Sequence, residues 1–158
     1  MSEHGSFDAK RWASTGSVDL SAIQQFFDGG IPFNAFVGLE LVEIERGRAL
    51  ARIPFRPELI GDPTRPALHG GVISMLADTI GGAAVFSVTD PGDRVATIDL
   101  RVDYLLPGRQ QDLLAEAVVI RVGNRVGVAS VRVWQPEGKH GDESIAVAKG
   151  VYTIKRGA

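Results

Sequence analysis

The sequence predicts an α+β domain in which an antiparallel β-sheet packs against one long helix. Apolar residues between positions 70 and 87 recur at helical spacing, and this is the only helical segment long enough to cover a sheet face. Two segments before it and four after it show the alternation of apolar and polar residues that is typical of half-buried strands. An antiparallel sheet with its helix on one side is the economical arrangement of these elements.

The composition of the chain limits the classes of function that it can have. The chain has 158 residues, 44% of them hydrophobic, and shows neither an internal repeat nor a linker. We expect a flexible N-terminal tail over residues 1–17 and a single domain over residues 18–158. A net charge of −2 gives no support to nucleic-acid binding, and the lack of cysteine excludes disulfides, zinc–thiolate sites and cysteine nucleophiles. With neither a signal-like N-terminus nor a bilayer-length apolar run, we expect a cytoplasmic protein without membrane contact.

The elements before the long helix are short. Ser17 or Asp19 can cap a first helix that ends at Gly29-Gly30, and a helical turn is expected over residues 31–37. Strands are expected over residues 39–45 and 49–55, because apolar side chains alternate there.

Residues 57–66 form a loop that contains three prolines, which is too many for a paired strand. The long helix then runs from about Gly70 to Ser87. Its Gly81-Gly82 pair weakens helix propensity by roughly 1 kcal/mol per glycine. Glycine can be tolerated there for two reasons. Another backbone or a ligand approaches the helix closely, or the helix packs tightly on the sheet.

Four strands follow the helix, over residues 97–104, 113–122, 126–134 and 145–154. Strict alternation in the first of them places Thr97 on the face opposite Ile98 and Leu100. The order of helix, two strands, long helix and four strands is that of the hotdog architecture, with the long helix in the concave side of the sheet. The later strands are apolar on both faces, which indicates that a second subunit buries part of the sheet.

The start of the long helix is the first candidate for chemistry. His69-Gly70-Gly71 leaves little side-chain bulk beside the first helical N–H groups, which have no partner within the helix and carry the positive end of its dipole. Such a site suits a carbonyl that becomes negative during attack, and it suits a phosphate equally well. A third reading is that the glycines only permit a sharp turn into the helix.

Asp78 is the second candidate, because a carboxylate in an apolar helix needs either a structural partner or a chemical role. It lies seven residues beyond Gly71, or ~10 Å along the helix axis. A metal site is disfavoured, since the three histidines, His4, His69 and His140, lack ligand spacing to one another. A serine-hydrolase elbow and phosphate-binding loops are missing from the sequence.

Four short motifs occur in a fixed order: His69-Gly70-Gly71, Leu76-Ala77-Asp78, Thr97-Ile98-Asp99-Leu100 and Tyr104-Leu105-Leu106-Pro107-Gly108. Over roughly residues 31–155, this combination resembles the hotdog-fold acyl-CoA thioesterases of the PaaI-like type, the phenylacetate-pathway group. The resemblance implies hydrolysis of an acyl-CoA to a free acid and coenzyme A. It also implies that no metal or other cofactor takes part, since coenzyme A is itself part of the substrate.

The resemblance also implies a role for each matching residue. Gly70 offers its backbone N–H to the thioester carbonyl, Gly71 allows that approach, and His69 holds the loop. Asp78 is the carboxylate that either activates water or attacks the thioester directly, and Thr97 orients the water. Each site is completed by the other subunit of a homodimer, and two dimers are expected to form a homotetramer.

The sequence departs from the family pattern at one position. Many members carry an asparagine about six residues before the histidine, whereas this chain has Pro63 there. Asp62 is the neighbouring residue that can substitute for it, with different charge and reach. For the phosphates of coenzyme A, the expected contacts are Arg65 and the turn residues Arg121, Asn124 and Arg125.

Two other functions remain open at this point. A hotdog hydratase or dehydratase needs a histidine as acid and base, but the two glycines after His69 differ from the usual hydratase pattern. A non-catalytic acyl-CoA-binding protein is the other alternative, and Pro63 in place of the amide favours it.

Overall fold

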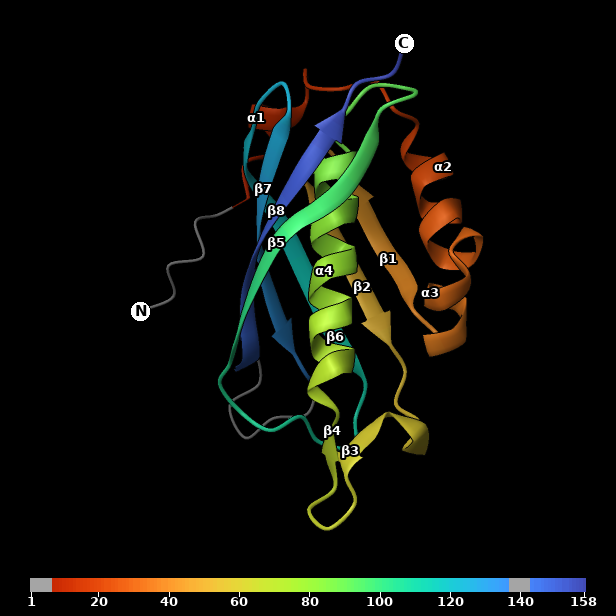
Figure 1. Cartoon of the computed structure of the whole chain (residues 1–158), viewed down its shortest axis with the longest axis vertical. Coiled ribbons are helices and arrows are strands. Elements are labelled where there is room, and N and C mark those ends of the chain that lie inside the picture. The colour runs from red at the N-terminus through yellow and green to blue at the C-terminus, as the bar shows by residue number, and fades with distance from the viewer. Residues whose placement is uncertain (1–6, 137–142) are drawn as a thin grey trace.

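The computed structural model describes residues 7–136 and 143–158, and its centre is α4 (Gly70–Phe86), enclosed by one curved sheet (Figure 1). The six strands of this sheet follow the order β1-β2-β6-β7-β8-β5, and each neighbouring pair is antiparallel. The predicted fold class, an antiparallel sheet wrapped around one long central helix, is therefore confirmed.

The strands agree with the predicted segments to within a few residues at each end. Their bounds are β1 Glu40–Glu45, β2 Arg48–Ile53, β5 Arg94–Tyr104, β6 Leu113–Val122, β7 Val126–Trp134 and β8 Ser144–Lys155. Among the described residues, β1 and β5 are the two edges of this sheet, and β5 carries most of its residues exposed.

Short helices precede the sheet; α2 and α3 lie on the side of α4 and β1, whereas α1 lies apart from them, beside β7 (Figure 1). They are α1 (Ala9–Trp12), α2 (Leu20–Gln25), a π-helical turn (Phe26–Gly30) and α3 (Pro32–Val37). The Asp19 side chain caps α2 by accepting from the Ser21 N–H at 2.9 Å, as predicted. Gly38 ends α3 with a φ of 77°, a left-handed conformation that glycine adopts without steric penalty.

Residues 7–17, the described part of the expected flexible tail, contact the rest of the domain. Trp12 is buried, and its ring packs so closely on the turn at Gly47 that a Cβ there would lie 2.5 Å from Trp12 Cδ1. Arg11 also donates to the Ile120 carbonyl at 3.0 Å. Burial of one large aromatic side chain outweighs the polar character of this segment. Residues 1–6 lie outside the described residues.

The expected proline-rich loop over residues 57–66 also contains more structure than predicted. Pro57–Leu59 forms a 3₁₀ turn, and β3 (Ile60–Asp62) pairs with β4 (Ala67–Leu68). Pro63 and Pro66 lie in the connection between these strands, where no ladder hydrogen bond is required of them.

α4 is buried on most of its surface because the sheet wraps around it. Its buried residues are Ile73, Leu76, Ala77, Ile80, Gly81, Ala83, Ala84 and Val85. Of the two explanations for the Gly81-Gly82 pair, tight packing on the sheet holds for Gly81: a Cβ there would overlap the hydroxyl of Tyr152 on β8. No helix within the described residues combines the length and apolarity needed to cross a membrane.

The two glycines of α4 should respond differently to alanine. Gly81→Ala should lower the free energy of unfolding by about 1–3 kcal/mol, because the new methyl group must displace the Tyr152 hydroxyl. At Gly82 a Cβ would lie 3.5 Å from Tyr152 Cε1, an ordinary contact. Gly82→Ala should therefore raise the free energy of unfolding, by about 0.5–1 kcal/mol. Urea unfolding followed by circular dichroism measures both, and equal effects of the two substitutions would contradict the packing.

Candidate active site

The N-terminus of α4 is capped by His69. Its Nδ1 accepts a hydrogen bond from the Gly71 N–H at 2.8 Å, and its carbonyl accepts from the Val72 N–H at 3.0 Å. Gly70 is the first helical residue, so its N–H has no acceptor within the helix. His69 thus caps the helix by a side-chain hydrogen bond, and the N–H of Gly70 belongs to the first turn, whose N–H groups have no acceptor within the helix.

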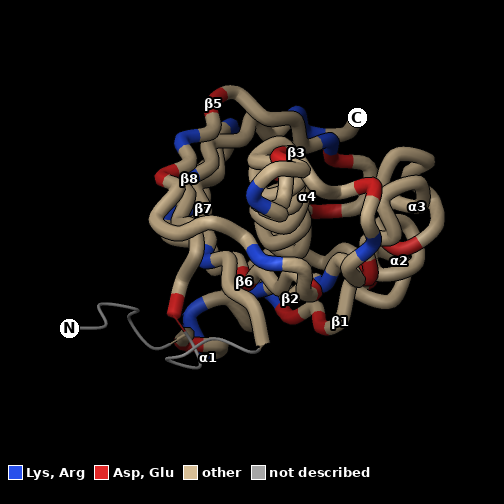
Figure 2. Tube along the Cα trace, turned by 90° about the horizontal axis from the view of Figure 1, so that it is seen from below, with Lys and Arg blue, Asp and Glu red and all other residues tan. Residues whose placement is uncertain are grey.

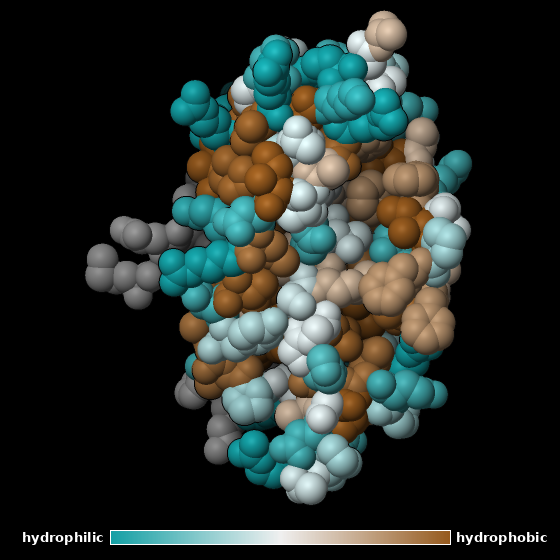
Figure 3. Space-filling view, viewed as in Figure 1, coloured by the Kyte–Doolittle hydropathy of each residue, from teal (hydrophilic) through white to brown (hydrophobic). Residues whose placement is uncertain are grey.

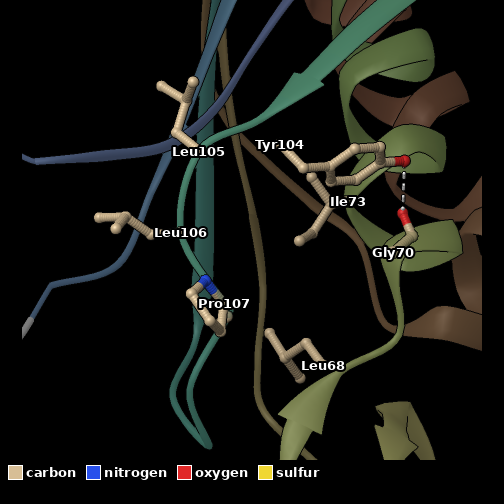
Figure 4. Close-up of a pocket in the computed structure, with 8 residues that line it drawn as sticks. Leu68, Gly70, Ile73, Tyr104, Leu105, Leu106 and Pro107 are labelled. Carbon is tan, nitrogen blue, oxygen red and sulfur yellow. Dashed lines mark hydrogen bonds between the residues drawn. The ribbon is translucent and has the colours of Figure 1, made fainter.

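Tyr104, the last residue of β5, packs on this helix start. Its hydroxyl donates to the Gly70 carbonyl at 3.1 Å (Figure 4). Its ring lies beside Gly70, where a Cβ would be 3.4 Å from Tyr104 Cε1. Between α4 and the segment that follows β5 is an open, largely apolar pocket of about 260 Å³. Its lining residues are Leu68, Gly70, Ile73, Tyr104, Leu105, Leu106, Pro107 and Gly108.

Asp78 lies half-buried at the middle of α4 and is bound from two directions. Its side-chain Oδ1 accepts from Thr97 Oγ1 at 2.8 Å, and its backbone carbonyl accepts from the Tyr152 hydroxyl at 3.0 Å. Thr97 and Tyr152 are directly opposed residues on the neighbouring strands β5 and β8. The sheet therefore presents two adjacent hydroxyl groups to one residue of the helix.

A β-bulge at Ile98 corrects the predicted faces of β5. The register shifts between Thr97 and Asp99, so Ile98 is an extra residue and is 58% exposed. Thr97 faces α4, and Leu100 also packs against the core. The prediction that Thr97 lies opposite Leu100 is wrong, because strict alternation does not hold across a bulge.

Tyr152 has its pKa raised above the ordinary value, first by burial of the phenol and second by the negative charge of Asp78. A raised pKa keeps the hydroxyl protonated at physiological pH. The phenol is protonated at this pH even at its ordinary pKa, so Tyr152 donates to the Asp78 carbonyl.

The hairpin of β3 and β4 carries Asp62 and Arg65 and lies across the N-terminal end of α4 when the molecule is seen from below (Figure 2). Asp62 accepts from the side chain and N–H of Thr64, at 2.6 and 3.0 Å, and pairs with Arg65 Nε at 3.2 Å. These hydrogen bonds, that of the Thr64 hydroxyl foremost, lower the pKa of Asp62 to about 2. Both carboxylate oxygens of Asp62 are thus engaged by its own loop.

Arg121, Asn124 and Arg125 flank the turn between β6 and β7, at the opposite end of α4 from Gly70 (Figure 1). Contact of Gly127 with Val85, near the C-terminal end of α4, places this turn. Within one chain, therefore, the structure brings Asp62 and Arg65 to the start of α4 but not these three residues.

Gly70 and Asp78 are also separated. Asp78 is eight positions after Gly70 on the helix, which corresponds to ~12 Å along the axis. One thioester carbonyl cannot contact both groups of a single chain. Among the described residues, no group of three or more His, Cys, Asp or Glu side chains is arranged to hold a metal ion. His4 and His140 lie outside the described residues.

Sequence reasoning missed the contributions of both tyrosines to this site. Tyr104 stands within one of the quoted motifs, but its contact with Gly70 crosses from strand to helix and has no sequence signal. Tyr152 alternates with the half-buried residues Val151 and Thr153, like any core position of a strand. Gly81 and Gly150, which are close to Tyr152 in space, leave room for its hydroxyl. These two glycines are the one signal in the sequence of this packing.

Comparison with known proteins agrees with the fold and the motifs. The family model described as "Thioesterase superfamily" matches residues 66–141. A putative esterase of Halobacterium salinarum is 36% identical, covering 87% of this chain and 94% of its own. The medium/long-chain acyl-CoA thioesterase YigI of Escherichia coli K12 is 31% identical, covering 90% of this chain and 97% of its own.

Solved structures show the same relationship. A thioesterase-superfamily protein from Shewanella oneidensis superimposes with a TM-score of 0.74 at 32% identity, covering 86% of this chain and 95% of that one. The PaaI protein of Escherichia coli has a TM-score of 0.73 at 20% identity, covering 89% of this chain and 99% of its own, a likeness in fold. The fold and the comparisons together define a thioester hydrolase of the hotdog type. The chain belongs to the thioesterase superfamily.

Proposed function

We propose that this protein hydrolyses acyl-CoA thioesters to a free acid and coenzyme A, with Asp78 as its catalytic carboxylate. The observation that carries the proposal is the hydrogen bond from Thr97 to Asp78, which holds a half-buried acid in a defined position on the helix. The relative YigI is named for activity on medium- and long-chain acyl-CoA, which supports this substrate class.

The chemistry begins at the carbonyl group. Its oxygen accepts a hydrogen bond from the Gly70 N–H, where the helix dipole favours the negative charge that develops during attack. With Asp78 as general base, a water proton moves to the carboxylate, the hydroxide bonds to the carbonyl carbon, and collapse of the intermediate expels the coenzyme A thiolate. With Asp78 as nucleophile, its carboxylate bonds to the carbonyl carbon, the C–S bond breaks and the coenzyme A thiolate leaves. Water then hydrolyses the acyl–aspartyl anhydride, which releases the acid, regenerates the carboxylate and supplies the proton that the thiolate takes up. Thr97 donates its own proton to Asp78, so its oxygen is free to accept from the attacking water.

The ~12 Å between Gly70 and Asp78 favours a composite site in a homodimer. In a two-fold dimer with antiparallel α4 helices, Gly70 of one subunit meets Asp78 of the other, and two equivalent sites form. The exposed edge β5 provides the interface. Thr97 lies beside Asp78 and Tyr104 beside Gly70 on this strand, so antiparallel pairing of β5 with its copy brings the same two groups together.

The surface supports this interface. The face that contains α4 shows apolar residues over β5 and over α2 and α3, on either side of a paler strip along the helix (Figure 3). Ile98 is 58% exposed on β5, and Phe33 and Phe36 are stacked and exposed on α3. Exposed apolar residues gathered on one face in this way are typical of an interaction surface.

The same symmetry gives the cationic residues a role. Where Gly70 of one subunit meets Asp78 of the other, the turn that carries Arg121, Asn124 and Arg125 lies ~12 Å further along α4, at its C-terminal end. We assign these residues, together with Arg65, to the phosphates of coenzyme A. A dimer of dimers is the proposed assembly, since half-buried apolar side chains such as Val128 and Val151 lie on the outer face of the sheet.

A non-catalytic acyl-CoA-binding protein is the second candidate, and Pro63 is the observation that favours it. Proline offers neither the donor nor the acceptor of an amide side chain, and Asp62 is engaged by its own loop. A hydratase is less well supported, because Nδ1 of His69 is occupied by the Gly71 N–H.

Asp78→Asn is the direct test of the catalytic carboxylate. The change is nearly isosteric and removes the charge, so we expect turnover to fall by at least about 10³-fold, with dimer content unchanged. Release of free thiol should be measured over aryl, short, medium and long acyl-CoA substrates, alongside enoyl-CoA hydration. Undiminished hydrolysis by the variant would remove Asp78 from the mechanism. Tight acyl-CoA binding by the unmodified protein without thiol release would instead establish the binding protein.

Gly70→Pro tests the oxyanion donor without disturbing the helix. Proline lacks the N–H but is favoured in the first turn of a helix, and His69, with φ −63° and ψ 129°, has the conformation that precedes proline. We expect kcat to fall about 10²–10³-fold while circular dichroism and the unfolding midpoint stay close to those of the unmodified protein. Gly70→Ala keeps the N–H and is the matched control. Wild-type kcat in Gly70→Pro would place the oxyanion elsewhere.

A further inference from the structure

We infer that Tyr152 is a positioning residue for Asp78, and that Tyr152 and Thr97 act as a pair that fixes the acid on the sheet. The inference rests on the proposed catalytic role of Asp78. Tyr152 contacts no reacting atom in this scheme and acts through the backbone of the helix.

The buried Tyr152 hydroxyl makes one specific hydrogen bond. The side chain is 1% exposed, and its hydroxyl donates to the Asp78 carbonyl at 3.0 Å. A phenylalanine would fill the same core volume without the requirement for a polar partner. Two glycines accommodate the group, because a Cβ at Gly81 or at Gly150 would overlap the hydroxyl. Three positions on two elements therefore combine to place one donor beneath Asp78.

α4 needs such a contact at its centre. The buried residues of α4 lie on one side of the helix and Asp78 lies among the half-buried residues of the other side, so burial sets the approximate rotation of the helix and directional bonds fix it more closely. Directional bonds fix its two ends: His69 and Tyr104 hold the start, and Arg46 donates to the Ser87 carbonyl at 2.8 Å just beyond the other end. Tyr152 holds the middle, at the residue whose orientation the chemistry requires.

Thr97 completes the arrangement because it is opposed to Tyr152 across β5 and β8. Thr97 binds the carboxylate of Asp78 and Tyr152 binds its carbonyl, so both ends of one residue are tied to neighbouring points of the sheet. The bulge at Ile98 begins directly after Thr97, and bulges commonly re-aim side chains beside active sites. Misplacement of a reacting group by ~1 Å can lower a rate about 10²-fold, so this double attachment has a kinetic consequence.

Tyr152→Phe keeps the ring and removes only the donor. We expect kcat for thioester hydrolysis to fall roughly tenfold while KM changes by less than about twofold, because substrate contacts are retained and the position of Asp78 is not. Thr89→Val is the matched control: the Thr89 hydroxyl is also buried and donates to a carbonyl of the same helix, that of Phe86, at 2.7 Å. This control should lose stability but retain its kcat.

A double-mutant cycle with Thr97→Val separates positioning from general destabilisation. If the two hydroxyls act as a pair, Tyr152→Phe should change kcat by less than about twofold in the Thr97→Val background. Full additivity, wild-type kcat in Tyr152→Phe, or an equal kcat loss in Thr89→Val would overturn the inference. These outcomes are distinct from failure of the proposed function, which would appear as undiminished hydrolysis by Asp78→Asn.

A second readout covers the case in which Tyr152→Phe does not fold. The chain has two tyrosines, so Tyr152 is the sole one in the Tyr104→Phe background. Fluorotyrosine incorporated there keeps the ring and the hydroxyl but strengthens the donor. The kcat should differ from that of the same background with ordinary tyrosine, and an identical kcat would contradict the positioning role.

Discussion

The structure depends on one constraint, the enclosure of an apolar helix within a single curved sheet. α4 supplies the core contacts of most strands, so each polar group on it requires a partner from the sheet or from the helix itself. Asp78 has such partners in Thr97 and Tyr152, and the helix start has His69 and Tyr104. The groups that serve the proposed chemistry are therefore held by the same bonds that orient the helix.

The helix also sets the geometry of the site. Gly70 and Asp78 occupy one rigid element and remain ~12 Å apart whatever the surrounding loops do. A site that uses both on one carbonyl must take them from two chains, and β5 is the sheet edge open to a second copy. Dimerisation is in this account a requirement of the chemistry and not only a source of stability.

The sequence predicted the fold well because the long helix and the alternating strands have strong periodic signals. The prediction was wrong where a bulge or a tight turn interrupts the alternation of apolar and polar residues. The bulge at Ile98 changed the expected faces of β5, and the prolines of residues 57–66 concealed the hairpin of β3 and β4. Trp12 was assigned to a tail because one buried aromatic side chain leaves no pattern. In the candidate site, the His69 cap was expected, whereas the roles of Tyr104 and Tyr152 depend on contacts between distant strands and the helix.

Subunit complementation tests the composite site most directly. Asp78→Asn and Gly70→Pro chains should each be nearly inactive, and refolding them together in equal amounts should form mixed dimers. In a mixed dimer one site carries both changes and the other carries neither, so about a quarter of wild-type activity should return. If Gly70 and Asp78 served the same site within one chain, each site would keep one defect. No recovery in verified mixed dimers would contradict the account.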